Sequence, residues 1–174
     1  RFMMNLKNNI VTTLLLAIGF ILHYITPGIL GGMKFDFLLI FIIISLLINR
    51  KFGNAILTGL LGGILSAMTT TFPGGQIPNI LDKIITCLVL FIIIRIFYRF
   101  SNNIIIVGFI GGLGTLISGT VFLLSAKLIV GLPAPIFALI ITVVLPTVLV
   151  NGIGTACVYK VVKTALRSSG FAIN

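Results

Sequence analysis

The stretch TTTFPGGQIPNILDK, residues 69–83, interrupts an otherwise apolar chain with turn-forming and charged residues. Pro and Gly in its first half break helices, and Pro78 suits the first turn of a new helix, where its missing N–H would be unpaired anyway. Asp82 is one of only two acidic residues in the chain, and it stands beside Lys83 at the start of an apolar run. The stretch therefore predicts a polar loop that leads into a helix, with an unusual charge pair at the entrance.

The composition predicts an all-α integral membrane protein. Of the 174 residues, 59% are hydrophobic and 8% are charged, and the mean hydropathy is +1.30. Apolar stretches recur that approach the roughly 20 residues needed to cross a bilayer core. Charged residues lie almost entirely between these stretches, as expected when a charge at the bilayer centre is costly.

We expect one transmembrane domain over residues 1–174, with Pro and Gly or charged residues at the breaks between helices. The predicted helices cover about 9–26, 36–49, 53–70, 78–98, 103–125 and 134–160.

Lys and Arg residues divide unequally between the two sides of this topology. Nine fall on the side of the termini, namely Arg1, Lys7, Arg50, Lys51, Arg95, Arg99, Lys160, Lys163 and Arg167. Three fall on the other side, namely Lys34, Lys83 and Lys127. The positive-inside rule therefore predicts a multi-pass protein of the bacterial cytoplasmic membrane, with both termini in the cytoplasm and residues 69–78 outside.

Several kinds of chemistry are absent from the sequence. It has no GxxxxGK[ST] phosphate loop and no HExxH motif, and it contains a single His. We therefore expect no enzymatic activity, no metal site and no cofactor on this chain. The net charge of +10 is scattered over the ends of apolar segments, which indicates contact with membrane lipid and argues against nucleic acid.

Two of the predicted helices carry glycines four apart, at Gly59 and Gly63 and at Gly108 and Gly112. This spacing lets helix backbones approach closely in a membrane, so we expect tight internal packing there. Pro146 is expected to kink the last helix.

The first turns of the helix after residue 78 have the composition of a binding site. Asn79, Asp82 and Lys83 can gather on one side of it. The helix N-terminus and Lys83 would favour a carboxylate, and Asp82 would favour an ammonium group, so together they suit a zwitterion. The alternative is that Asp82 caps the helix dipole while Lys83 extends to the lipid headgroups.

A second polar loop, GILGGMKFD at 28–36, supplies Lys34 and Asp36. An Asp36–Lys83 or Lys34–Asp82 pair would hold this loop over the polar loop at 69–83, either as a structural contact or beside a ligand.

Other side chains near these loops could also contact a ligand. Gln76 could donate and accept amide hydrogen bonds. Flat side chains at the same level suit an aromatic amino acid; these are His23, Tyr24, Phe35, Phe37 and Phe72.

Two long strings carry a family resemblance. LHYITPGILGGMKFD at 22–36 and TTTFPGGQIPNILDK at 69–83 resemble the tryptophan-specific substrate-binding subunit, or S component, of energy-coupling-factor (ECF) transporters. The resemblance implies a six-helix S-component-like bundle that captures tryptophan from outside for uptake. It also implies two kinds of partner, a transmembrane coupling subunit and two cytoplasmic ATPases that use ATP.

The family commonly carries small residues four apart on its first helix for docking to the coupling subunit. Here Thr13 and Ala17 have that spacing, which departs from the Ala–Ala form.

Two other functions remain open from the sequence. One is an S component for another small molecule such as a vitamin, and the other is a ligand-free membrane scaffold or assembly factor.

Overall fold

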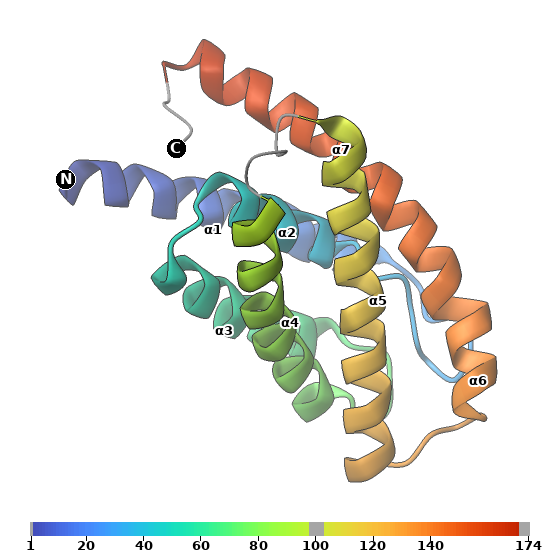
Figure 1. The fold of residues 1–174 in the computed structure, drawn as a ribbon. Helices are drawn as coiled ribbons and strands as arrows, with labels where there is room; N and C mark the ends of the chain where they lie inside the picture. Colours follow the sequence, from blue (N-terminus) through green and yellow to red (C-terminus); the bar gives the residue numbers. More distant parts are fainter. Residues whose placement is uncertain (1, 98–102, 171–174) are drawn as a thin grey trace.

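The computed structural model describes residues 2–97 and 103–170, and every regular element in these ranges is helical (Figure 1). The elements are α1 (Phe2–Ile25), α2 (Leu38–Ile48), α3 (Phe52–Thr69), α4 (Gln76–Phe97) and α5 (Ile104–Ile129), followed by one continuous helical segment of α6 (Ile136–Leu139), the π-helix η2 (Ile140–Val144) and α7 (Leu145–Ser168).

A helix is present in each of the six predicted regions, but four of the helices extend further than predicted. The fourth begins at Gln76 instead of about 78, and the fifth ends at Ile129 instead of about 125. The first begins at Phe2 instead of about residue 9, and the last continues to Ser168 instead of ending near 160. The prediction ended both where charged residues begin, yet a helix keeps its backbone hydrogen bonds where it leaves the hydrocarbon region. Residue 98, the predicted end of the fourth helix, lies outside the described ranges.

Four helical segments of the described chain are long and apolar enough to cross a membrane. They are Leu6–Ile25, Phe52–Thr69, Ile104–Ile129 and Ile136–Ser168. Helix α2 is different, because it has 11 residues and all of them are buried. At about 1.5 Å per residue it is roughly 16 Å long, well short of the roughly 30 Å hydrocarbon core. It is therefore a core helix enclosed by the other helices.

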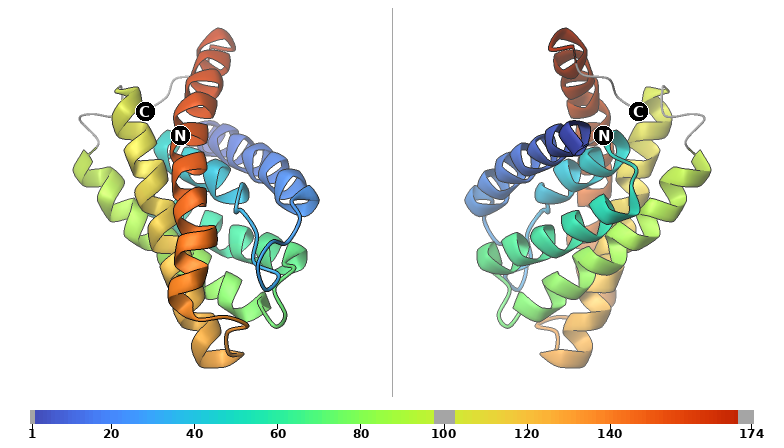
Figure 2. Two further views of the ribbon diagram at one scale, coloured as in Figure 1. Left: turned by 90° about the vertical axis from the view of Figure 1, so that its right-hand side faces the viewer. Right: turned by 90° about the vertical axis from the view of Figure 1, so that its left-hand side faces the viewer.

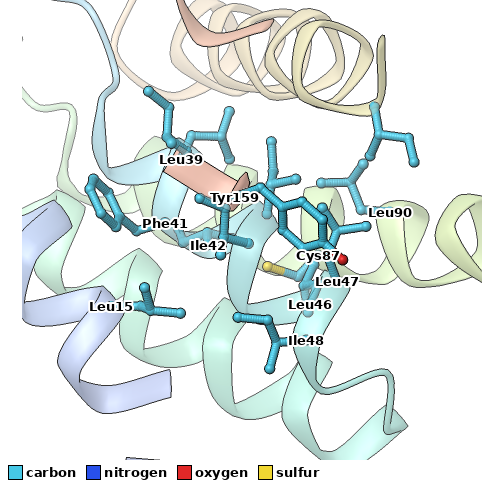
Figure 3. Close-up of a cluster of buried hydrophobic side chains, with 14 of the residues drawn as sticks. Leu15, Leu39, Phe41, Ile42, Leu46, Leu47, Ile48, Cys87, Leu90 and Tyr159 are labelled. Atoms are coloured by element: carbon cyan, nitrogen blue, oxygen red, sulfur yellow. The ribbon is translucent and has the colours of Figure 1, made fainter. Parts of the chain in front are cut away.

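The centre of the bundle forms around α2 because its sequence, LLIFIIISLLI, is apolar on every side. Helices α1, α3, α4, α5 and α7 all contact it. Figure 3 shows Leu15 from α1, Leu90 from α4 and Tyr159 from α7 packed around the α2 side chains. The burial of α2 fixes the position of its N-terminal end, where Asp36 precedes it.

The predicted close packing at the paired glycines is confirmed. A Cβ atom added at Gly63 would lie 3.0 Å from the Cα atom of Ile80 on α4. One added at Gly108 would lie 3.2 Å from the backbone oxygen of Gly152 on α7. The glycines thus bring α3 against α4 and α5 against α7.

The last helix departs from regular α-helical geometry just before Pro146, where η2 covers Ile140–Val144. Proline cannot donate a backbone hydrogen bond and crowds the preceding turn, and a π-helical turn is a common way to accommodate such a disruption. The Thr147 hydroxyl donates to the Val143 carbonyl at 2.6 Å, which supplies a partner within this turn. The sequence predicted a kink at Pro146, and the structure has a π-helical turn shortly before that residue.

The first turn of α1 and the last turn of α7 lie toward one end of the molecule (Figures 1 and 2). The α5–α6 and α3–α4 connections lie toward the other end. This arrangement agrees with the predicted topology, in which the termini lie on one side and the loop at 69–78 lies on the other. Of the basic residues counted for that prediction, Arg1 and Arg99 lie outside the described residues. Which end faces the cytoplasm stays a prediction.

We predict that Ser168 faces the cytoplasm and that Gln76 faces outside. Both side chains are exposed, so a cysteine at either position should be accessible from its own side. In a background in which Cys87 and Cys157 are replaced by Ser, an impermeant thiol reagent on intact cells should label Gln76→Cys and spare Ser168→Cys. The reverse labelling pattern would invert the topology.

We also predict that Gly63→Ala destabilises the bundle by about 1–3 kcal/mol, because the new methyl group meets the backbone of α4. Gly53→Ala is the matched control on the same helix, since its Cβ would have open space around it. The control should keep or raise stability, because Ala favours helix more than Gly does. Thermal unfolding of the two purified variants compares them, and equal midpoints would argue against tight packing at Gly63.

Candidate ligand-binding cavity

A cavity lies among the two polar connections and helices α4, α5, η2 and α7. Apolar residues and all of the chain's acidic residues meet in its wall. The stretch at 69–83 therefore contributes to an internal site as well as to a loop.

Lys83 is held between both acidic residues of the chain. Its Nζ lies 2.6 Å from Asp36 Oδ2, contacts Asp82 Oδ2, and lies 3.3 Å from Ser118 Oγ. The Lys83 and Asp82 side chains are each only 1% exposed. The alternative in which Lys83 extends to the headgroups and Asp82 caps the helix at its surface is therefore wrong.

Asp82 is bound by hydroxyl groups as well as by Lys83. Thr86 Oγ1 donates to Asp82 Oδ1 at 2.9 Å, one turn further along α4. Ser118 Oγ donates to Asp82 Oδ2 at 2.9 Å from α5. These bonds fix the carboxylate between two helices.

Of the two predicted cross-pairs, Asp36–Lys83 is the one that forms. Lys34 instead donates to the backbone carbonyls of His23, at 2.5 Å, and Thr69, at 2.7 Å. These carbonyls belong to the last turns of α1 and α3, where a positive charge is favourable. Lys34 thus joins the ends of two helices at the rim of the cavity.

Asp36 lies at the N-terminal end of α2, and its Oδ1 accepts a hydrogen bond from Leu39 N at 3.2 Å. His23 Nε2 is 3.8 Å from the same oxygen, while His23 Nδ1 is 2.6 Å from Thr69 Oγ1. Burial raises the pKa of Asp36, but the charges of Lys83 and His23 and the hydrogen bonds from Lys83 and Leu39 together outweigh it, so the pKa lies below its usual value. The carboxyl is therefore ionised at neutral pH.

The apolar part of the cavity is aromatic. Phe72, from the α3–α4 connection, meets Phe122 of α5 edge to face, with ring centroids 5.3 Å apart. Met33, Val143 and Val144 complete this wall. A flat apolar group can thus bind next to buried charges.

The model of the family described as "Tryptophan transporter TrpP" matches residues 5–167. The chain belongs to this tryptophan transporter family. Three relatives are each named "probable tryptophan transport protein". That of Clostridium acetobutylicum is 48% identical, covering 94% of this chain and 96% of its own length. That of Clostridium perfringens is 41% identical, covering 94% and 97%.

The third relative, from Bacillus subtilis, is 42% identical over 97% of both chains. No solved structure matches the chain. Membership of this transporter family and the apolar spanning helices make the chain a multi-pass protein of the cell membrane.

In this member of the tryptophan transporter family, most of the predicted binding residues lie together. Seven of the eight predicted residues line the cavity, namely His23, Lys34, Asp36, Phe72, Asn79, Asp82 and Lys83. Asn79 is already paired within the protein, since it accepts from Ser66 Oγ at 2.8 Å and donates to the Gly75 carbonyl at 2.8 Å.

Gln76 departs from the prediction, because it is the first residue of α4 and its side chain is exposed. The helix begins two residues earlier than expected, which leaves Gln76 outside the set of lining residues. Thr13 and Ala17 are exposed on α1, as a docking face requires.

Helix α5 contributes to the cavity in a way that was not predicted from the sequence. Thr115, Ser118 and Phe122 all line the cavity. They are spaced three and four residues apart, which puts them on one face of the helix. Two hydroxyl residues and an aromatic residue on one face of an apolar helix are the sequence pattern that could have indicated this part of the cavity wall.

Proposed function

We propose that the chain is the substrate-binding membrane subunit of an ATP-driven ECF-type importer, and that the cavity captures tryptophan from outside. The observation that carries this proposal is the aromatic wall of Phe72 and Phe122 beside a buried group of charges. The family and its relatives' names support tryptophan as the substrate.

The charges in the cavity favour a zwitterion. Lys34 and Lys83 balance Asp36 and Asp82, so the site has no net charge when His23 is neutral. A ligand with a net charge would leave an unpaired charge in a site shielded from water, which is costly. A free amino acid carries one charge of each sign and preserves the balance.

The aromatic wall favours a large flat side chain. An indole placed against Phe72 and Phe122 would remove apolar surface from water and make ring contacts. The hydroxyl groups of Thr70, Thr115 and Thr147 also line the cavity. They offer acceptors for an indole N–H, which a buried indole usually requires.

The energy source is proposed to lie on other chains. The sequence lacks a phosphate-binding loop, so ATP would be used by two cytoplasmic ATPases. A transmembrane coupling subunit would join them to this chain. In this proposal the chain has no enzymatic role and carries no cofactor, both termini are cytoplasmic, and six helices form a single membrane domain of the S-component type.

A second candidate function is uptake by this chain alone, coupled to an ion gradient. The observation that favours it is the buried series of titratable groups from His23 through Asp36 to Lys83, since buried ionisable residues often mark proton pathways in transporters. An S component for a vitamin and a ligand-free scaffold remain as further alternatives.

The purified chain is expected to bind tryptophan without any partner but not to accumulate it. The chain contains no Trp, so the ligand's own fluorescence reports on the site, and emission should move to shorter wavelength as the indole enters the apolar cavity. Proteoliposomes with only this chain should show no concentrative uptake, with ATP or with an imposed proton or sodium gradient.

Three results would contradict parts of the proposal. Uptake driven by an ion gradient alone would support the second candidate. A vitamin that raises the thermal stability of the chain while tryptophan does not would identify a different substrate, because a ligand of the native state stabilises it. Absence of any stabilising ligand would favour the scaffold.

Docking to the coupling subunit is expected to use the exposed face of α1 that carries Thr13 and Ala17. Ala17→Leu should reduce co-purification with the coupling subunit, because close helix approach needs small side chains. Tryptophan binding should stay within about twofold of the parent, since Ala17 is exposed on α1 and does not line the cavity. Thr120→Leu, at an exposed position of α5, is the matched control, and equal co-purification of both variants would place the docking face elsewhere.

A further inference from the structure

We infer that the four charges of the cavity divide into two pairs with different roles. The inner pair, Asp82 and Lys83, holds the helices together. The outer pair, Asp36 and Lys34, binds the ammonium and the carboxylate of the substrate. This inference rests on the proposed function and specifies which residues determine the substrate class.

The inner pair has little capacity left for a ligand. A lysine ammonium has three N–H donors, and Lys83 has three acceptors around it, in Asp36, Asp82 and Ser118. Both oxygens of Asp82 are also occupied, one by Thr86 and the other by Ser118 and Lys83. Direct contact with a ligand would require breaking bonds that already satisfy these charges.

Exposure separates the two carboxylates in the same way. The Asp36 side chain is 19% exposed, whereas that of Asp82 is 1% exposed. Asp36 Oδ2 accepts from Lys83, and Oδ1 accepts one hydrogen bond at 3.2 Å, from Leu39 N. Because an ionised carboxylate has about four acceptor sites, Asp36 can still accept from a substrate ammonium.

Lys34, the positive member of the outer pair, keeps one N–H donor for a ligand. Two of its three N–H groups bind the carbonyls of His23 and Thr69. The third has no partner among residues 2–97 and 103–170, and Lys34 lines the cavity. A carboxylate can therefore bind Lys34 while the two backbone bonds stay in place.

Asn151 of α7 holds the backbone of Asp36 in place. Its Nδ2 donates to the Asp36 backbone carbonyl at 2.9 Å and to Thr115 Oγ1 at 3.1 Å. The Asn151 side chain is fully buried. The backbone of Asp36 is thus fixed against α5 and α7, which leaves its carboxylate directed to the inner lysine and the cavity.

The test compares isosteric variants of the two carboxylates with three ligands. Tryptophan carries both charges, tryptamine lacks the carboxylate, and indole-3-propionate lacks the ammonium. Dissociation constants are measured by calorimetry on the purified full-length chain, with Asp36→Asn as the outer variant and Asp82→Asn as the inner one. Lys34→Gln tests the carboxylate side, because its amide can still donate to a backbone carbonyl.

Asp36→Asn should weaken tryptophan and tryptamine by about 30-fold or more, the loss expected when one partner of a buried charge pair is removed. Indole-3-propionate should lose clearly less affinity than the other two ligands, because it has no ammonium for Asp36 to bind, and any loss it does show measures the effect of leaving Lys83 with one carboxylate fewer. Lys34→Gln should weaken tryptophan and indole-3-propionate but spare tryptamine. Asp82→Asn should lower the thermal stability and affect all three ligands equally.

Two results would overturn the inference. One is an equal loss of all three ligands in Asp36→Asn, and the other is selective sparing of indole-3-propionate in Asp82→Asn, which would assign the ammonium to Asp82. If Asp82→Asn does not fold, the double variant Asp82→Asn/Lys83→Met is measured in its place, because it removes both charges of the inner pair. Failure of the unaltered chain to bind tryptophan would refute the proposed function, a separate outcome.

Discussion

The rest of the structure depends on the Lys83 ammonium group that lies between Asp36 and Asp82. It joins α4 to the residue that precedes α2, and Ser118 extends the contact to α5. Removing one partner would leave an uncompensated buried charge, at a cost of about 3–5 kcal/mol. The inner pair thus has a structural role, and Lys83 also holds the Asp36 carboxylate at the wall of the cavity, where the outer pair is proposed to bind the ligand.

Helix α2 provides the frame in which this charge group forms. Its burial on every side fixes the level of Asp36 within the bundle, and glycines bring the surrounding helices close enough to enclose it. The two polar connections meet directly, since Thr71 Oγ1 donates to the Gly32 carbonyl at 2.6 Å. Gly32 has a φ of 82°, a conformation that glycine adopts readily, and here it permits the contact that closes one side of the cavity.

These features connect to transport through the α1–α2 connection. It carries both Lys34 and Asp36, and it follows directly from α1, the helix proposed to dock to the coupling subunit. A ligand bound to the outer pair would bridge this connection to α5 through Phe122. In the proposed function, this short path in the chain would let a bound substrate influence the position of α1 and so signal occupancy to the partner subunits.

The sequence by itself determined the membrane location, the six helical regions, the close packing at the glycines and a set of eight candidate residues, of which seven line one cavity. Each depends on local composition or spacing, which hydrophobic burial and backbone sterics translate directly into structure. Only the tertiary structure decided that Asp36 and not Lys34 reaches α4, that Ser118 and Phe122 of α5 help to line the cavity, and that Gln76 is exposed and not part of its wall. These outcomes depend on the rotation and depth of each helix in the bundle, which packing between distant segments sets and no local pattern specifies.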